Sequence, residues 1–162
     1  MPHKWISKVS KSIGYLVIFL AGQTYIMGLL SEPVERITSV ALSSLGAIVA
    51  LSALCFAVVP CLSSEDDKIA PMHAGEKFFH STLLLIQTLF LKYAANAILS
   101  YAWVKSTVWL FVILPFLNGV LITGIGLFAV LNVAWGFDSL NRFFWQRYEL
   151  RVHSQNISST PK

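Results

Sequence analysis

The sequence has few charged residues and few cysteines, and both shortages restrict what the protein can be. Only 12% of its 162 residues are charged, whereas 56% are hydrophobic. A water-soluble domain of this size would need more charge at its surface, so the composition is typical of an integral membrane protein. The two cysteines form no C-x-x-C pair, which disfavours a disulfide framework, a zinc module and a thiol redox enzyme.

Acidic residues are missing from every long apolar run. A hydrocarbon core of about 30 Å needs roughly 20 apolar residues as a helix, and four runs reach that length. Their approximate bounds are 13–30, 39–61, 78–104 and 108–137, and none contains Asp or Glu. Proton-driven pumps and intramembrane aspartyl proteases use acids at membrane depth, so both classes are excluded. No P-loop, G-x-S-x-G or Rossmann fingerprint occurs, and no cofactor is expected.

The four runs predict an all-α fold. Backbone groups in lipid are satisfied only in helices or closed barrels, and these runs lack the alternation of barrel strands. We therefore expect an integral membrane four-helix bundle over residues 13–137, preceded by an amphipathic cytoplasmic lead-in at 1–12. The stretch 62–77 is predicted to be a polar loop, and 138–162 to be a cytoplasmic amphipathic helix and tail.

The distribution of basic residues predicts the orientation. Nine Lys and Arg residues flank the runs on the side of both termini, whereas only Arg36 and Lys105 flank them on the other side. Because basic flanks stay in the cytoplasm, both termini are predicted to be cytoplasmic, and the compact loops suit a bacterial inner membrane. The charges lie between apolar runs and form no single basic face, so direct binding of nucleic acid is not expected.

A polar stripe interrupts the third run at every fourth residue. It consists of Thr88, Lys92, Asn96 and Ser100. A charged side chain near the middle of a span costs on the order of 3 kcal/mol or more, and no carboxylate in any run can neutralise Lys92. Three interpretations remain open: a lysine held by neutral groups or snorkelling, one that lines a wet cavity or pore, and one that binds an anionic headgroup or ligand.

Small residues recur at helical spacing in the second and fourth runs. The two sets are Gly46, Ala50, Ala53 and Ala57, and Gly119, Thr123 and Gly126. Small residues in register let membrane helices approach closely. Packing within one bundle is the favoured interpretation, and contact between copies in a homo-oligomer is the alternative.

Basic and aromatic residues at the two ends of the chain are predicted to form a cytoplasmic collar. Phe137, Leu140, Phe143, Phe144 and Tyr148 share one helical face, which is typical of an amphipathic helix at the inner headgroup layer. Such a face binds either anionic lipid, the favoured interpretation, or a cytosolic protein. The collar residues are Lys4, Lys8, Lys11, Arg142, Phe144, Trp145, Arg147 and Arg151.

His73, Glu76 and His80 are the one group with the spacing of metal ligands. They would share a helical face if a helix began near His73. Gly75 weakens a helix there, and no second His pair could complete a site. We therefore expect no metal, and an integral-membrane metal enzyme is the weakest of the functional hypotheses.

In length, number of spans and cytoplasmic termini, the chain resembles the small membrane subunit of bacterial anti-phage systems such as Kiwa, in which a four-span protein works with a cytosolic DNA-binding effector. The resemblance covers layout and transfers no functional residue. It implies a non-enzymatic membrane subunit that oligomerises and anchors, senses for or signals to a cytosolic partner. The alternatives are an anion-favouring channel or transporter lined by Lys92, and an immunity protein against pore-forming toxins.

Overall fold

The computed structural model describes residues 2–104 and 107–158, and side chains for 5–33, 36–103 and 107–152. These residues form four long helices and one short 3-10 turn, and they contain no strand, which confirms the all-α prediction. The elements are α1 (Pro2–Ser31), α2 (Val34–Val58), η1 (Val59–Cys61), α3 (Glu65–Val104) and α4 (Leu110–Ser158). All four long helices within the described residues are long and apolar enough to cross a membrane.

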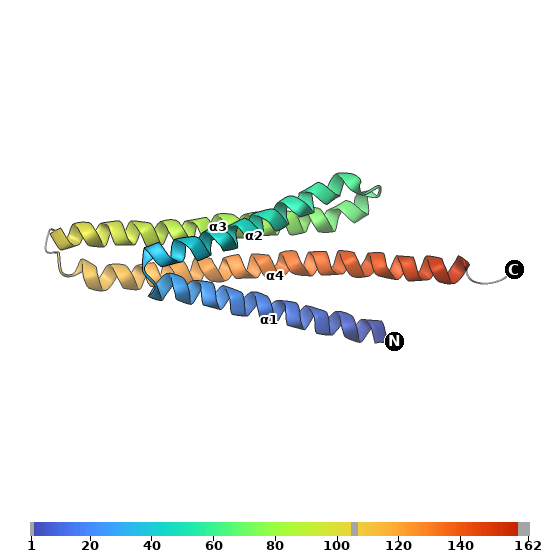
Figure 1. Ribbon diagram of the computed structural model, residues 1–162, viewed down its shortest axis with the longest axis horizontal. Helices are drawn as coiled ribbons and strands as arrows, with labels where there is room; N and C mark the ends of the chain where they lie inside the picture. Colours follow the sequence, from blue (N-terminus) through green and yellow to red (C-terminus); the bar gives the residue numbers. More distant parts are fainter. Residues whose placement is uncertain (1, 105–106, 159–162) are drawn as a thin grey trace.

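The helices run up and down along one long axis (Figure 1). Both termini and η1 lie at one end of the bundle, which we call the terminal end. The connections from α1 to α2 and from α3 to α4 lie toward the other end, which we call the link end. α3 and α4 extend beyond the α1–α2 connection at the link end, and α4 also extends farthest at the terminal end.

Two segments differ from the sequence-based expectation. Residues 65–77, expected as a polar loop, form the first turns of α3. Glu65, Asp66 and Asp67 occupy its first turn, where acidic side chains stabilise the positive end of the helix dipole. Gly75 does not end the helix, because its missing side chain makes room for the ring of Phe56. Residues 138–158, expected as a separate helix, continue α4 without a break.

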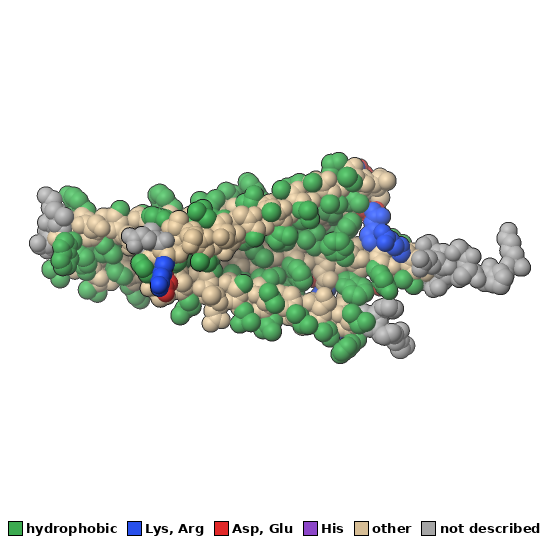
Figure 2. All heavy atoms as spheres, in the orientation of Figure 1, with side chains coloured by type: hydrophobic (Ala, Val, Ile, Leu, Met, Phe, Trp, Pro, Cys, Tyr) green, Lys and Arg blue, Asp and Glu red, His purple; other side chains and the backbone are tan. Residues whose placement is uncertain are grey.

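α3 and α4 pack against each other along most of the bundle and hold the other two helices. α2 packs mainly on α3 and α1 mainly on α4, whereas α1 and α2 make few contacts with each other. The buried core is thin and consists of three small clusters. Most large hydrophobic side chains lie outside it, and they cover the visible face of the bundle (Figure 2). Such a surface requires an apolar environment.

Glycines bring α1 close to α4. A methyl group built on Gly22 would lie 2.2 Å from Cγ2 of Val130, and one on Gly14 would lie 2.3 Å from the ring of Phe137. The contact is reciprocal, since Gly126 of α4 accepts Ile26 of α1 at 2.8 Å by the same measure. Close approach at small residues is how helices associate where burial from water contributes little.

The α1–α4 contact can be tested at Gly22. Gly22→Ala should destabilise the protein by about 1–3 kcal/mol, because the added methyl group overlaps Val130. The midpoint of thermal unfolding in detergent measures this. Gly124→Ala is the control, since no atom lies within 4 Å of a methyl group there. Gly22→Ala with Val130→Ala should lose less stability than the two single variants together. Equal midpoints for Gly22→Ala and the parent would contradict the contact.

Candidate functional site

An ion-pair network at the terminal end ties α1 to α4. Nζ of Lys11 donates to Oδ1 of Asp138 at 2.9 Å, and Nη2 of Arg142 lies 2.7 Å from Oδ2 of the same carboxylate. The side chain of Asp138 is only 17% exposed. A partly buried carboxylate that is shared by two cations is screened less than a surface pair, so this network helps to fix the start of α1 on α4.

A second set of contacts ties the first turns of α3 to α4. Nη2 of Arg147 donates to Oδ2 of Asp67 at 2.6 Å. Nδ1 of His73 and Oγ of Ser139 are 3.0 Å apart, and Nζ of Lys77 lies 5.2 Å from the centre of the Trp135 ring. Through Asp67, the acidic start of α3 therefore contacts the collar, and it is helical and not a loop.

Three of the five residues of the amphipathic face that the sequence predicts on α4 are packed inside the chain. Phe137 packs at Gly14, Leu140 packs against the cluster of Cys55, Ala74 and Phe78, and Phe143 is buried. The extra turns of α3 and the start of α1 thus cover part of the face expected to meet lipid, and α4 continues through this contact without a break.

The collar residues that remain exposed lie on the outer side of α4. Phe144 is 64% exposed, and Tyr148 and Leu150 are also exposed. Trp145 is half-buried and packs edge-on against Tyr148. Lys8, Arg142 and Arg151 are exposed at the same end, whereas the side chain of Lys4 is outside the described residues. The exposed part of the collar therefore combines an aromatic residue, Phe144, with basic residues.

At the link end, Lys92 lies level with the connection from α1 to α2. Its neighbour Tyr93 forms a hydrogen bond with Thr38, in the first turns of α2. Glu32 and Arg36 form an ion pair at 3.6 Å across this connection. Lys92 therefore lies near the level of this charged connection, although it is in the middle of an apolar run. At 1.5 Å per residue it lies about 22 Å along α3 from Lys77.

The polar stripe passes from the core to the outer surface of the chain. Thr88 is buried and donates to the carbonyl of Leu85, and Lys92 is partly buried. Asn96 and Ser100 are exposed, and Ser100 donates to the carbonyl of Asn96. The four residues therefore do not line one interior path through a single chain.

The two small-residue sets lie in different surroundings. Gly126 is buried against Ile26, Gly119 lies near Leu30, and Thr123 is partly buried, so the set on α4 faces α1. On α2, by contrast, Gly46, Ala50, Ala53 and Ala57 are all exposed. No atom lies within 4 Å of a methyl group built on Gly46. Packing within one chain therefore does not account for the α2 set, which we call the small-residue stripe.

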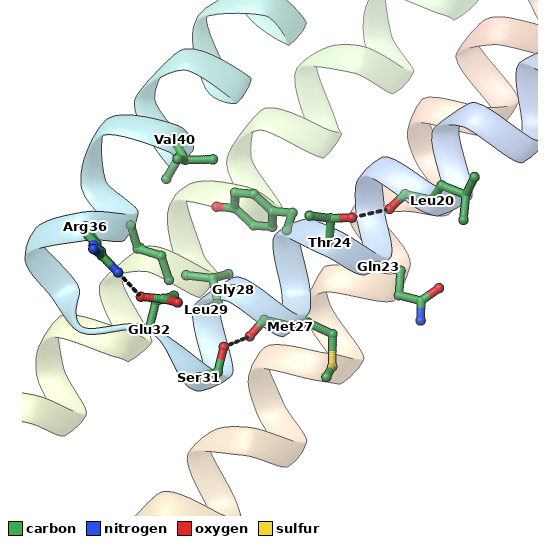
Figure 3. A pocket seen from close by; sticks show the side chains of 13 residues that line it. Leu20, Gln23, Thr24, Met27, Gly28, Leu29, Ser31, Glu32, Arg36 and Val40 are labelled. Carbon is green, nitrogen blue, oxygen red and sulfur yellow. Dashed lines mark hydrogen bonds and ion pairs between the residues drawn. The ribbon is translucent and has the colours of Figure 1, made fainter.

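A pocket of about 730 Å³ lies between α1 and α2 at the link end (Figure 3). Its walls are mostly apolar and include Leu20, Leu29, Ile37 and Val40. Figure 3 shows Glu32 and Arg36 pointing toward one another at one end of the pocket and Leu20 at the other. A second hollow of about 260 Å³ adjoins it through Tyr25 and reaches side chains of α3 and α4.

The His73, Glu76 and His80 group does not gather into a site. His73 contacts Ser139, and the side chains of Glu76 and His80 are exposed. Within residues 2–104 and 107–158, no three His, Cys, Asp or Glu side chains are close enough to hold a metal ion.

The sequence reasoning missed the acidic partners of the collar. Asp138 and Arg142 are four residues apart on a helix, and this spacing predicts an ion pair. Asp67 and Arg147 are 80 residues apart, and no local pattern connects them.

No protein-family model matches the chain, and no curated protein or solved structure matches it either.

Proposed function

We propose that the protein is a non-enzymatic subunit of a bacterial inner membrane that self-associates and binds a cytosolic protein through its collar. The observation that carries the proposal is that α4 runs unbroken for 49 residues, about 74 Å, from the link end to the collar. One rigid helix therefore connects the apolar bundle with the exposed aromatic residues. The layout shared with the Kiwa membrane subunit makes anti-phage defence the proposed setting.

The proposed position places the terminal end at one membrane surface and the link end toward the other. Charged residues lie at two levels along the helices, which supports it. Lys11, Lys77 and Asp138 lie toward the terminal end, and Glu32, Arg36 and Lys92 lie toward the link end. Along α1, Lys11 and Glu32 are about 32 Å apart, and along α3, Lys77 and Lys92 are about 22 Å apart. The first spacing is close to a hydrocarbon core of about 30 Å, and the second places Lys92 inside that core, from where its side chain can extend toward the headgroups. The excess of basic residues at the terminal end favours the cytoplasm for that end.

The collar has the composition of a protein-binding surface. Aromatic residues and arginine are enriched in the centres of interfaces, and Phe144 is an exposed aromatic anchor on a helix that is already ordered. The pairs of Asp138 with Lys11 and of Asp67 with Arg147 hold that helix in place. A surface ordered before binding loses less conformational entropy on association, which favours affinity.

The collar can be tested by purifying the protein in mild detergent and quantifying the soluble protein that accompanies it. Phe144→Asp should reduce the bound companion about tenfold or more, because it removes a central aromatic anchor. Ile69→Asp is the matched control: Ile69 is 63% exposed on α3 near the same end but lies outside the collar. A photo-cross-linking residue at position 144, and not at 69, should form an adduct with the companion.

Both aspartate variants should keep the thermal midpoint of the parent, because both side chains are exposed. Equal loss of the companion in the two variants would contradict a role of the collar. Cross-linking of position 144 to lipid alone would support the lipid-binding interpretation of the collar instead.

Self-association is proposed to use the small-residue stripe on α2. The stripe is exposed along the helix, and small residues in register are a common contact between membrane helices. Gly46→Leu should shift the oligomer toward monomer by about tenfold or more in bilayers, as measured by energy transfer between labelled copies.

The control for Gly46→Leu is Gly124→Leu, because each glycine has open space around it and only Gly46 lies on the stripe. The Gly124 variant should associate like the parent. Unchanged association of the Gly46 variant would show that copies do not meet at this stripe.

The proposed orientation can be tested on the native cysteines. Cys61 is exposed at the terminal end, whereas Cys55 is buried. A membrane-impermeant maleimide should therefore label the protein in inside-out vesicles and leave it unlabelled in intact spheroplasts. Cys61→Ser should abolish the labelling. Labelling of Cys61 in intact spheroplasts would place the terminal end outside the cytoplasm.

A further inference from the structure

The pocket between α1 and α2 has no role in the proposed function. Among the described residues it is lined by α1, α2 and the connection between them. The second hollow shares Tyr25 with it and is lined by all four long helices. We call the pocket between α1 and α2 the groove. The volume of the groove, about 730 Å³, is in the range of sites for small ligands.

The groove is apolar along its length and charged at one end. Arg36 marks the charged end, and its side chain is 81% exposed. The 3.6 Å separation from Glu32 is longer than a hydrogen bond. Most of the five donors of the guanidinium therefore remain available to a ligand, and their planar arrangement suits a phosphate group.

The surroundings of the groove determine which ligand can reach it. α1 and α2 are both long and apolar enough to cross a membrane, and Leu20, Met27 and Val40 at the edge of the pocket are exposed. If the membrane lies as proposed above, the groove opens sideways into lipid and Arg36 lies near the headgroups. An apolar groove that ends at a phosphate-binding side chain complements a lipid with an acyl chain and a phosphate.

We propose that this groove binds one phospholipid, whose phosphate lies against Arg36 and one of whose acyl chains lies between α1 and α2. The inference rests on the membrane position of the proposed function but not on the collar. The bound chain fills the space between α1 and α2, which make few contacts with each other.

Native mass spectrometry of the intact protein in mild detergent can test the site with three probes. Phosphatidylglycerol supplies both parts of the ligand, diacylglycerol with the same chains lacks the phosphate, and inorganic phosphate lacks the chains. We expect one phosphatidylglycerol per chain to bind, and diacylglycerol to bind about tenfold more weakly. Inorganic phosphate should form no adduct.

Three variants separate the phosphate contact from the groove. Arg36→Gln should weaken phosphatidylglycerol about tenfold and leave diacylglycerol unchanged. Gly28→Phe should weaken both lipids, because Gly28 lines the pocket and its nearest neighbour, Ile37, is 4.0 Å from an added methyl group. Gly124→Phe is the control on an open helix surface and should bind both lipids like the parent.

Several outcomes would overturn the assignment. Equal affinities for phosphatidylglycerol and diacylglycerol would contradict a contact between the phosphate and Arg36. An adduct with inorganic phosphate would indicate a site for a soluble anion. Equal binding of the lipids by the Gly28 and Gly124 variants would contradict the groove as the binding site. A dimer that is lost in Gly28→Phe, with no lipid adduct, would assign the groove to a second copy of the chain.

Two further measurements keep these results interpretable. The thermal midpoint shows whether Gly28→Phe is folded, and Val40→Trp fills the same pocket from α2 if it is not. Phe144→Asp should keep the lipid adduct, since the collar is at the opposite end. Loss of the companion and loss of the lipid are therefore separate results.

Discussion

The packing of α3 against α4 is the contact on which the other elements depend. α2 and α1 each lie mainly on one member of this pair and contact each other little. Their positions are therefore set through α3 and α4, by glycine contacts such as that of Gly126 with Ile26 and by the ion pair of Lys11 with Asp138. The same arrangement leaves a groove between α1 and α2, because few direct contacts join these two helices.

The collar results from the fact that two helices are longer than a membrane span requires. α3 begins at Glu65 and α4 continues to Ser158, and each extension covers part of the other. Arg147 reaches Asp67, and Phe143 is buried in this contact. A single extension would expose an amphipathic face to water or lipid. Two extensions that pack together bury part of that face and leave Phe144 exposed on the outer side.

The four apolar runs could be predicted from the sequence because each is governed by local composition. The helical state of residues 65–77 could not, because it depends on contacts with Phe56 and Arg147, which are distant in the sequence. For the same reason, the sequence does not predict which small-residue set contacts another helix of the chain. Gly46 and Gly126 have the same local pattern, yet only Gly126 faces another helix. The spacing of small residues predicts that they share one face of a helix. Whether another helix packs on that face depends on residues that are distant in the sequence.

The two helix pairs have different lengths, and this difference bears on the proposed membrane position. From Lys77 to Trp103, α3 is about 39 Å long, close to the 40–45 Å of a bilayer with its headgroups. Trp103 and Tyr101 near its end are exposed aromatic residues of the kind enriched at headgroup level. The α1–α2 connection stops near Tyr93, about 15 Å short of Trp103. A bilayer that matches the lengths of both helix pairs must be thinner beside α1 and α2 than beside α3 and α4. A lipid phosphate bound at Arg36 would hold the headgroups at the level of the α1–α2 connection.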